Sequence, residues 1–503
     1  MKKLLTIVLM GMTSGVFGIE ELPEAMRKIM VQEKYQHAIW GVYVKDLKTS
    51  EVLYDLNSDK LFSPASTTKL FTVAALLHAY GDDYRFKTPV YSNGVIENGT
   101  LSGNLILIGQ GDFTFGGRQS DPDHITYTKM DHITANEIPG TLLTPQDPLQ
   151  ALDELARQIA QTGIKTIKGD VLIDDSLFES TVKRGMTLSP VALNENLIDF
   201  MLNPSERGQI AKLTWRPVVR GYTVSNGVTT GAQGSALDVT VEVDEQGRHF
   251  TLKGTIPADQ TNVVRTAPIV DPKAFMQAAF IQALEQQNIK VTGQQVRNVS
   301  DQRQLVAKWI SPPLSEYGKL ILKVSHNYGA NMVPLLLASQ KEEKTFDAGM
   351  RLLGDFATQT VKLSPDSFVF IDGAGGNENR LTPRASIALL EWIYKQPKGQ
   401  FQPYFDALPI LGVDGSLEDF AKHSKAAGKV RAKPGTGVAL NTATGDFFLI
   451  TQAFAGYIQG KNGHLYGYEV VVNNGKMPTV QDIFPIFEDE GQLSSLIYEH
   501  TAP

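Results

Sequence analysis

The chain has 503 residues, of which 42% are hydrophobic and 20% are charged, an ordinary composition for a globular protein that is long enough for more than one domain. Its net charge of −7, without a basic cluster that contains aromatic residues, argues against nucleic acid or an anionic membrane surface as a partner. Zero cysteines exclude a disulfide framework, thiolate catalysis and a cysteine metal site.

Residues 1–18 have the pattern of a secretory signal peptide. Met1-Lys2-Lys3 precede an apolar run from Leu4 to Met12, and Val16-Phe17-Gly18 fit cleavage before Ile19. The run is too short to span a bilayer, and no second apolar run of about 20 residues follows. We therefore predict a periplasmic or otherwise exported protein without an integral membrane anchor.

The pattern after the signal predicts a helix over 20–34, a strand pair at 38–44 and 51–54, and a helix built on the apolar run 70–77. The segment 82–268 is rich in short strand patterns separated by Gly, Asp and Asn turns. We interpret it as an inserted, mostly β region of one or two subdomains, with one helix near 148–162.

The rest of the chain returns to helical spacing and then to strands. Helices are predicted at 272–288, 312–340 and 383–394, and strands at 429–433, 446–459 and 465–474, with a hairpin turn at 460–463. These elements predict a mixed α/β (α+β) fold in which helices flank an antiparallel sheet. The predicted catalytic domain is discontinuous and comprises residues 19–81 and 269–503.

Three short motifs occur in one order: Ser66-Thr67-Thr68-Lys69, Ser325-His326-Asn327 and Lys433-Pro434-Gly435. Similar short patterns occur elsewhere in the chain, but they are not followed by an apolar run that could form a buried helix. Ser180 and Lys183 also have the Ser-x-x-Lys spacing, but they lie in a polar stretch with no apolar helix behind it. Ser66, in contrast, precedes the apolar run 70–77, so Lys69 should lie one turn later on the same helix face.

These residue types suit nucleophilic catalysis by Ser66. A serine hydroxyl needs a base, and Lys69 can be that base if burial and a second cation, Lys433, lower its pKa. Ser325 would relay a proton to the leaving amine, while Asn327 would hold the lysine and a substrate amide. The backbone N–H groups of Ser66 and Thr436 would bind the oxyanion.

The three motifs and several further segments together resemble the pattern of a known protein family. Gly109-Gln110-Gly111-Asp112, 168–174, Leu193-Asn194-Glu195-Asn196 and 381–384 occur in the order seen in class C low-molecular-mass penicillin-binding proteins, which the chain resembles over nearly its whole mature length. The resemblance implies a penicillin-binding/β-lactamase-like transpeptidase domain and D-alanyl-D-alanine carboxypeptidase or endopeptidase activity. It also implies peptidoglycan stem peptides as substrates, β-lactam antibiotics as covalent inhibitors, and no cofactor.

Two positions depart from the family pattern. Pro434 stands where the family has a threonine whose hydroxyl helps to bind the substrate carboxylate, and Ala374 replaces a serine in Asp372-Gly373-Ala374-Gly375-Gly376. Proline belongs on an edge strand, where Gly435 would still allow close substrate approach. Thr436 or Thr442 is a candidate for the missing hydroxyl.

The resemblance further places Asp174 near the site, where it would meet the free amino group of the stem peptide's diamino acid; capping of a turn is the alternative. Two other functions stay open: a β-lactamase, and a weakly active protein that binds cell-wall peptide. A Ser-His-Asp triad through His326 and Asp372 is disfavoured because Ser66 lacks a Gly-x-Ser-x-Gly elbow. No His-Glu-x-x-His spacing occurs, so we predict no metal site.

Overall fold

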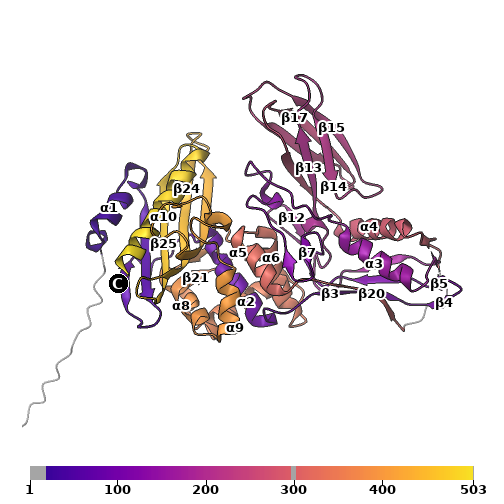
Figure 1. The fold of residues 1–503 in the computed structure, drawn as a ribbon, viewed down its shortest axis with the longest axis horizontal. Coiled ribbons are helices and arrows are strands. Elements are labelled where there is room, and N and C mark those ends of the chain that lie inside the picture. The colour runs from indigo at the N-terminus through magenta and orange to yellow at the C-terminus, as the bar shows by residue number, and fades with distance from the viewer. Residues whose placement is uncertain (1–17, 296–301, 502–503) are drawn as a thin grey trace, which may run out of the picture.

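The computed structural model describes residues 18–295 and 302–501, so the predicted signal segment lies almost entirely outside the described residues. The molecule is elongated, with a sheet and its helices at one end and a second lobe at the other (Figure 1). We define the second lobe as residues 87–310. Among the described residues, no helix is both long and apolar enough to cross a membrane.

The central sheet has five strands in the order β2-β1-β25-β24-β23, and every neighbouring pair is antiparallel. Its strands are β1 (Ile39–Asp46), β2 (Val52–Leu56), β23 (Val430–Leu440), β24 (Phe447–Gln459) and β25 (Leu465–Lys476). Because β1 pairs with β25, segments from the two ends of the chain share one sheet. This arrangement confirms the predicted antiparallel sheet.

Helices cover both faces of this sheet. On one face, α1 (Glu24–Met30) and α10 (Ile483–His500) enclose a core with strand residues that include Trp40 and Val470. The opposite face carries the larger helical core, which contains Tyr43 and Tyr457 of the sheet. That core is built by α2 (Lys69–Tyr80), α5 (Leu314–Lys323), α6 (Asn327–Ser339), α7 (Phe346–Asp355), α8 (Pro383–Tyr394) and α9 (Lys398–Asp406). A short strand pair, β21 (Phe368–Val369) and β22 (Arg380–Leu381), lies on the chain between α7 and α8.

The second lobe consists mainly of short strands. Its sheets have the orders β10-β6-β3-β20, β19-β9-β5-β4, β14-β13-β18 and β15-β17-β16, and β7-β8 and β11-β12 form separate hairpins. The strands are β3 (Lys87–Ser92), β4 (Val95–Glu97), β5 (Thr100–Ser102), β6 (Leu105–Ile108), β7 (Gln119–Asp121), β8 (His124–Ile125), β9 (Thr166–Ile167), β10 (Val171–Asp174), β11 (Thr181–Lys183), β12 (Met186–Leu188), β13 (Leu197–Asn203), β14 (Lys212–Arg216), β15 (Thr223–Thr230), β16 (Asp238–Val243), β17 (His249–Ile256), β18 (Val263–Pro268), β19 (Lys290–Val291) and β20 (Gln304–Ile310).

Two helices complete the second lobe, α3 (Gln150–Gln161) and α4 (Pro272–Gln286). Leu155 of α3 and Phe280 of α4 belong to one buried cluster, and β20 pairs with β3. α4 and β20, which the sequence pattern grouped with the catalytic domain, therefore pack in the second lobe. The reason is that the apolar face of α4 is buried against α3 and the strands, away from the central sheet.

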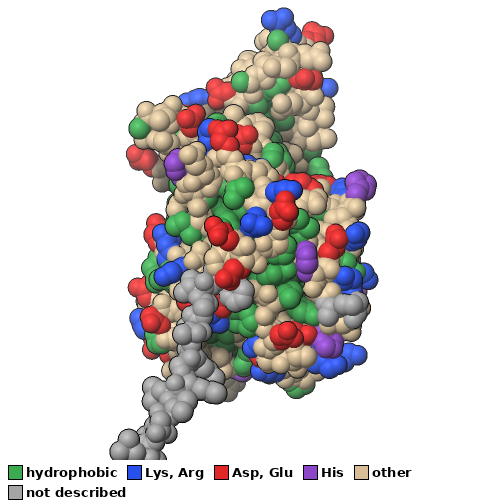
Figure 2. Space-filling model, turned by 90° about the vertical axis from the view of Figure 1, so that its left-hand side faces the viewer, with side chains coloured by type: hydrophobic (Ala, Val, Ile, Leu, Met, Phe, Trp, Pro, Cys, Tyr) green, Lys and Arg blue, Asp and Glu red, His purple; other side chains and the backbone are tan. Residues whose placement is uncertain are grey.

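The predicted helix over 312–340 is two helices. α5 ends at Lys323 and α6 begins at Asn327, because Ser325 between them has a φ of 63°, in the left-handed region that interrupts a right-handed helix. The predicted helix over 20–34 is also shorter, and α1 ends at Met30. Over the end of the molecule that bears α1, acidic, basic and apolar side chains are interspersed (Figure 2).

Candidate active site

Ser66 lies in a 3-10 turn, η3 (Ala65–Thr68), that leads directly into α2. Ala65 before it has a φ of 43°, a strained conformation for a residue with a side chain. Lys69 is the first residue of α2, and its Nζ lies 2.8 Å from Ser66 Oγ. The structure thus brings the serine and the lysine into contact at the spacing that the motif predicts.

The Lys69 amine is fully buried and has two further partners. Its Nζ donates to Asn327 Oδ1 at 2.8 Å and to the backbone carbonyl of Ala374 at 2.6 Å. A neutral amine that keeps these two donor bonds has its lone pair left for the Ser66 hydroxyl. Lys69 is therefore oriented to accept the proton of Ser66.

Burial and the neighbouring cations Lys433 and Arg184 lower the pKa of Lys69 well below its usual value. Asp372 acts in the opposite direction and raises this pKa. Lys433 is also fully buried, and burial lowers its pKa to about 7. Its Nζ donates to the backbone carbonyl of Pro434 at 2.7 Å. Two lysines that lose their protons this easily suit proton transfer near neutral pH.

Strand β23 approaches the nucleophile at Gly435. A Cβ atom on this residue would overlap the carbonyl oxygen of Pro64 and lie 3.2 Å from the backbone nitrogen of Ser66. Glycine is therefore required where the strand passes the serine. The close approach places the backbone of Gly435 beside Ser66.

β23 is an edge strand, which accounts for Pro434. The N–H of Ala432 donates to Pro409 O at 3.0 Å, away from β24, and residues two apart on a strand direct their backbone groups to the same side. The nitrogen of Pro434 therefore faces the open edge, and no ladder hydrogen bond is lost. Thr436 donates its hydroxyl to Gln452 Oε1 at 2.8 Å, and Thr442 lies in the exposed turn after the strand.

Ser325 and Asn327 lie on either side of the start of α6. Asn327 contacts Lys69 as described, but among the described residues the Ser325 hydroxyl makes no hydrogen bond to Lys69 or Lys433. His326 between them does not point to the nucleophile; its Nδ1 accepts from the N–H of Gly329 at 3.0 Å. The alternative of a Ser-His-Asp triad therefore has no geometric support.

One residue near the site, Arg184, was not predicted from the sequence motifs. Arg184, in the turn between β11 and β12, donates to Gly375 O at 3.3 Å, and its Nε lies 3.9 Å from Asp372 Oδ2. Asp372 Oδ1 in turn accepts from the backbone N–H groups of Ala374, Gly375 and Gly376. The polar stretch around Arg184 carried no signal that it folds back onto this loop.

Asp174 ends β10 and holds the following turn. Its Oδ1 accepts from the Ser176 N–H at 3.1 Å and from the Ser176 hydroxyl at 2.6 Å, and Arg303 lies 4.0 Å away. Within residues 18–295 and 302–501, no hydrogen bond or ion pair joins Asp174 to Ser66, Lys69 or Asn327. The same described residues contain no group of three or more His, Asp and Glu side chains suited to a metal ion.

Comparisons with known proteins find relatives that match most of the chain. The chain is 26% identical over 488 residues to the D-alanyl-D-alanine carboxypeptidase of Actinomadura sp. (strain R39), a match that covers 91% of this chain and 81% of the relative. Penicillin binding protein 4 (dacB) from Haemophilus influenzae has the same fold, with a TM-score of 0.71 and 22% identity over 94% of this chain and 99% of the other. That protein has also been solved in complex with a β-lactam, where the TM-score is 0.70.

A family model described as D-Ala-D-Ala carboxypeptidase 3 (S13) matches residues 22–483, which is most of the chain. The match confirms the family predicted from the motifs. It also spans both the central sheet and the second lobe. The chain belongs to the D-Ala-D-Ala carboxypeptidase 3 (S13) family.

Proposed function

We propose that this chain, a serine DD-peptidase by family, hydrolyses D-Ala-D-Ala or D-Ala cross-link bonds of peptidoglycan peptides through an acyl-enzyme on Ser66. The observation that carries the proposal is the contact of 2.8 Å between Ser66 Oγ and the buried Nζ of Lys69. The family supports the bond class, and the contact supports Ser66 as the nucleophile and Lys69 as its base.

Neutral Lys69 takes the proton of Ser66 as Oγ attacks the carbonyl carbon of the scissile amide. The backbone N–H groups of Ser66 and Thr436 bind the oxyanion. In support, β23 passes Ser66 at Gly435, and the N–H of Thr436 faces the same open edge as the nitrogen of Pro434, two residues before it. The C–N bond then breaks, and the leaving amine receives the proton, relayed by Ser325. Water next attacks the Ser66 ester, which yields the acid and restores the serine.

The chemistry also fits covalent inhibition by β-lactams. Attack of Ser66 on the lactam carbonyl would open the ring and leave an acyl group on the serine. The leaving nitrogen then stays attached to that acyl group. The complex of the Haemophilus influenzae protein with a β-lactam supports this proposal.

The packing suggests a revised domain division. We place the catalytic domain at residues 19–81 and about 312–503, and the insert at about 82–311, because α4 and β20 pack with α3 and β3. Export through the segment 1–18 remains part of the proposal. A periplasmic location would expose the enzyme to its peptide substrates.

Two assays test the function. Release of D-Ala from a stem pentapeptide should occur with the unmodified chain and should be lost in Ser66→Ala. A fluorescent penicillin should label the unmodified chain with a long-lived adduct and leave Ser66→Ala unlabelled. Labelling of Ser66→Ala would contradict the assigned nucleophile.

The same assays separate the alternatives. Rapid turnover of the penicillin without D-Ala release would indicate a β-lactamase. Peptide binding without release would indicate the weakly active binding protein, for which Pro434 in the third motif is the motivating feature.

A further inference from the structure

His326 separates two residues of the second catalytic motif and is itself fully buried. It is the N-cap of α6: its Nδ1 accepts from the Gly329 N–H, while its own carbonyl accepts from Ala330 at 3.1 Å. An Nδ1 that accepts a hydrogen bond places the remaining ring proton of a neutral imidazole on Nε2. The ring therefore carries a donor, Nε2–H, on the side away from α6.

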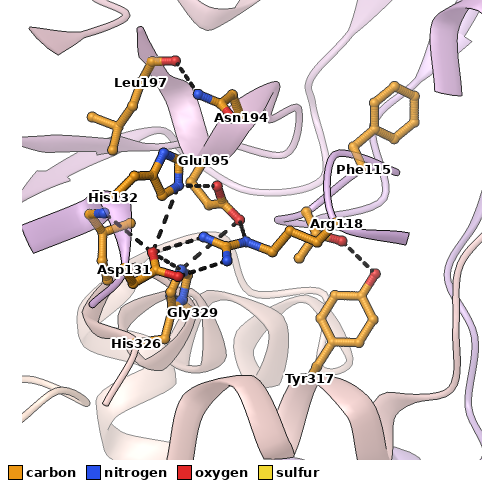
Figure 3. A network of polar contacts seen from close by, with 12 residues as sticks. Phe115, Arg118, Asp131, His132, Asn194, Glu195, Leu197, Tyr317, His326 and Gly329 are labelled. Carbon is orange, nitrogen blue, oxygen red and sulfur yellow. Dashed lines mark hydrogen bonds and ion pairs between the residues drawn. The ribbon is translucent and has the colours of Figure 1, made fainter. Parts of the chain in front are cut away.

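That donor faces a largely buried set of charges from the second lobe, which we call the ion cluster. Figure 3 shows Arg118, Asp131, His132 and Glu195 of this cluster. Asp199 and the partly buried Arg216 complete it. His326 Nε2 lies 3.9 Å from Asp131 Oδ1 and 4.0 Å from Glu195 Oε1. Among the described residues, Nε2 has no partner at hydrogen-bond distance. Two carboxylates of the ion cluster therefore lie near this nitrogen, and Arg118, which binds both, also acts on His326.

The members of the ion cluster hold one another in place. Arg118 donates to both oxygens of Asp131 at 2.7 and 2.8 Å and to Glu195 Oε1 at 2.6 Å. His132 lies between Glu195 Oε2, at 2.7 Å, and Asp199 Oδ1, at 2.6 Å. Arg216 closes the chain at Asp199 Oδ2, 3.0 Å away.

The charges of the ion cluster balance when His326 is neutral. Burial alone would lower the pKa of His132, but Asp199 and Glu195 outweigh it and raise the pKa to about 10. Burial lowers the pKa of His326 to about 4, and the attraction of Asp131 does not offset it. Three cations, Arg118, His132 and Arg216, then face three carboxylates, so the cluster needs no charge from His326.

A second contact joins the same loop to α6. Asn194, Glu195 and Asn196 have φ values of 51°, 52° and 57°, three successive left-handed residues that are individually unfavourable. Asn196 Nδ2 donates at 3.1 Å to the hydroxyl of Tyr328, which lies two residues after His326. The strained loop thus presents Glu195 and Asn196 to His326 and Tyr328, the residues on either side of Asn327.

We propose that His326 is a positioning residue that joins the Ser325-x-Asn327 motif to the ion cluster of the second lobe, so that the cluster sets the position of Asn327 on Lys69. The inference rests on the proposed roles of Ser66 and Lys69. It assigns a function to the Leu193-Asn194-Glu195-Asn196 segment, which no catalytic step uses.

Two substitutions distinguish the N-cap role of His326 Nδ1 from the role of His326 Nε2–H. In His326→Asn the side-chain oxygen occupies the place of Nδ1 and keeps the N-cap, whereas the Nε2–H is lost. In Glu195→Gln the second lobe loses one charge that faces Nε2. Both variants should acylate more slowly with a fluorescent penicillin, by roughly 10- to 100-fold, the range expected when a catalytic group is misplaced by about 1 Å.

The pH profile distinguishes positioning from general destabilisation. Asn327 Oδ1 accepts from Lys69, which favours the charged lysine, so displacement of Asn327 should move the acid limb of the acylation profile to lower pH. Leu155→Ala is the matched control, since it opens a cavity in the core of the second lobe away from His326. It should lower the Tm without moving the acid limb.

Hydrogen exchange of the amides of residues 325–330 gives a second readout that needs no substrate. Exchange of these amides should be faster in Glu195→Gln than in Leu155→Ala. In the double variant Glu195→Gln/His326→Asn, exchange should be little faster than in either single variant. Unchanged acylation and exchange in folded Glu195→Gln, or the same changes in Leu155→Ala, would overturn the positioning role. If the unmodified chain were not acylated, the proposed function would fail. The exchange rates of Glu195→Gln and Leu155→Ala would still show whether the ion cluster holds residues 325–330 in place.

Discussion

Arg184 of the second lobe donates a hydrogen bond to the backbone carbonyl of Gly375, at 3.3 Å, across 191 positions of the chain. Gly375 itself lies against the nucleophile, since a Cβ atom on it would overlap the carbonyl of Ala65 and approach the Ser66 nitrogen to 2.9 Å. The contact brings a guanidinium charge to the rim of the site. The second lobe therefore affects the acidity of Lys69.

Arg184→Gln should raise the pKa of Lys69, because Arg184 is one of the cations that lower it. The acid limb of the acylation profile should then move to higher pH, and the rate below that limb should fall. Lys183→Gln removes the same charge from the same hairpin, but Lys183 lies over the ring of Phe346, 4.1 Å from its centre, and serves as the control. An equal shift in both variants would indicate a general effect of net charge.

Gly435→Ala should slow acylation by about 100-fold or more, because the added Cβ meets backbone atoms of Pro64, Ser66 and Thr67, which cannot move without displacing the nucleophile. Gly354→Ala adds the same methyl group in α7, where no atom lies within 4 Å, and should leave acylation unchanged. The second-order rate constant with a fluorescent penicillin measures both. A Gly435→Ala variant as fast as the unmodified chain would refute the close approach of β23.

Lys433→Met should abolish activity and yet stabilise the fold. The folded-state pKa of Lys433 is about 7 against an ordinary 10.5, so the unfolded chain binds more protons between these values. The resulting cost, roughly 3–5 kcal/mol, is complete below pH 7 and disappears as pH rises towards 10.5. Denaturant unfolding should show a larger gain at pH 7 than at pH 9; a gain that does not change with pH would contradict the shift.

Pro434→Thr restores the hydroxyl of the family motif. A hydrogen bond to a substrate carboxylate is worth about 1.5–3 kcal/mol, so cleavage of peptides with a free terminal carboxylate should rise by about tenfold or more. Cross-linked dimers that lack a carboxylate at this position should change less. Slower cleavage of both substrates would mean that the proline is needed for the shape of the strand edge.

Asp174→Asn tests recognition of the diamino acid. Asparagine keeps the oxygen that accepts from Ser176, so the turn should survive while the charge is lost. If Asp174 meets the free amine of the stem peptide, KM for that peptide should rise, and KM for the amine-acetylated peptide should stay unchanged. Equal effects on both peptides would leave Asp174 as a residue that only holds the turn.

The sequence was sufficient to predict features that depend on residues close together along the chain. The spacing of Ser66 and Lys69 predicted their contact, because three residues make about one helical turn, and the strand patterns predicted the antiparallel sheet. The break at Ser325 was not predictable in this way. Apolar residues continue on both sides of it, and one left-handed residue leaves no mark on their periodicity.

Long-range packing accounts for the other differences. The change from strand to helix patterns near residue 269 suggested a domain boundary, whereas α4 buries its apolar face on α3 of the second lobe. Arg184 and Glu195 reach the catalytic motifs only through folded loops. Arg184 lies in a polar turn, and such turns are common on any protein surface. Glu195 lies in a short polar segment between apolar residues, which does not show which partners it has.

The pairing of β1 with β25 has a consequence for the order in which the chain can fold. Trp40 pairs with Val472, so the central strands of the catalytic sheet are separated by most of the polypeptide. Strand pairs of the second lobe are closed within residues 87–310, so that lobe has its partners as soon as this stretch is available. We therefore expect the nucleophile to stay unassembled until the last strands arrive, which delays acylation competence to the end of folding.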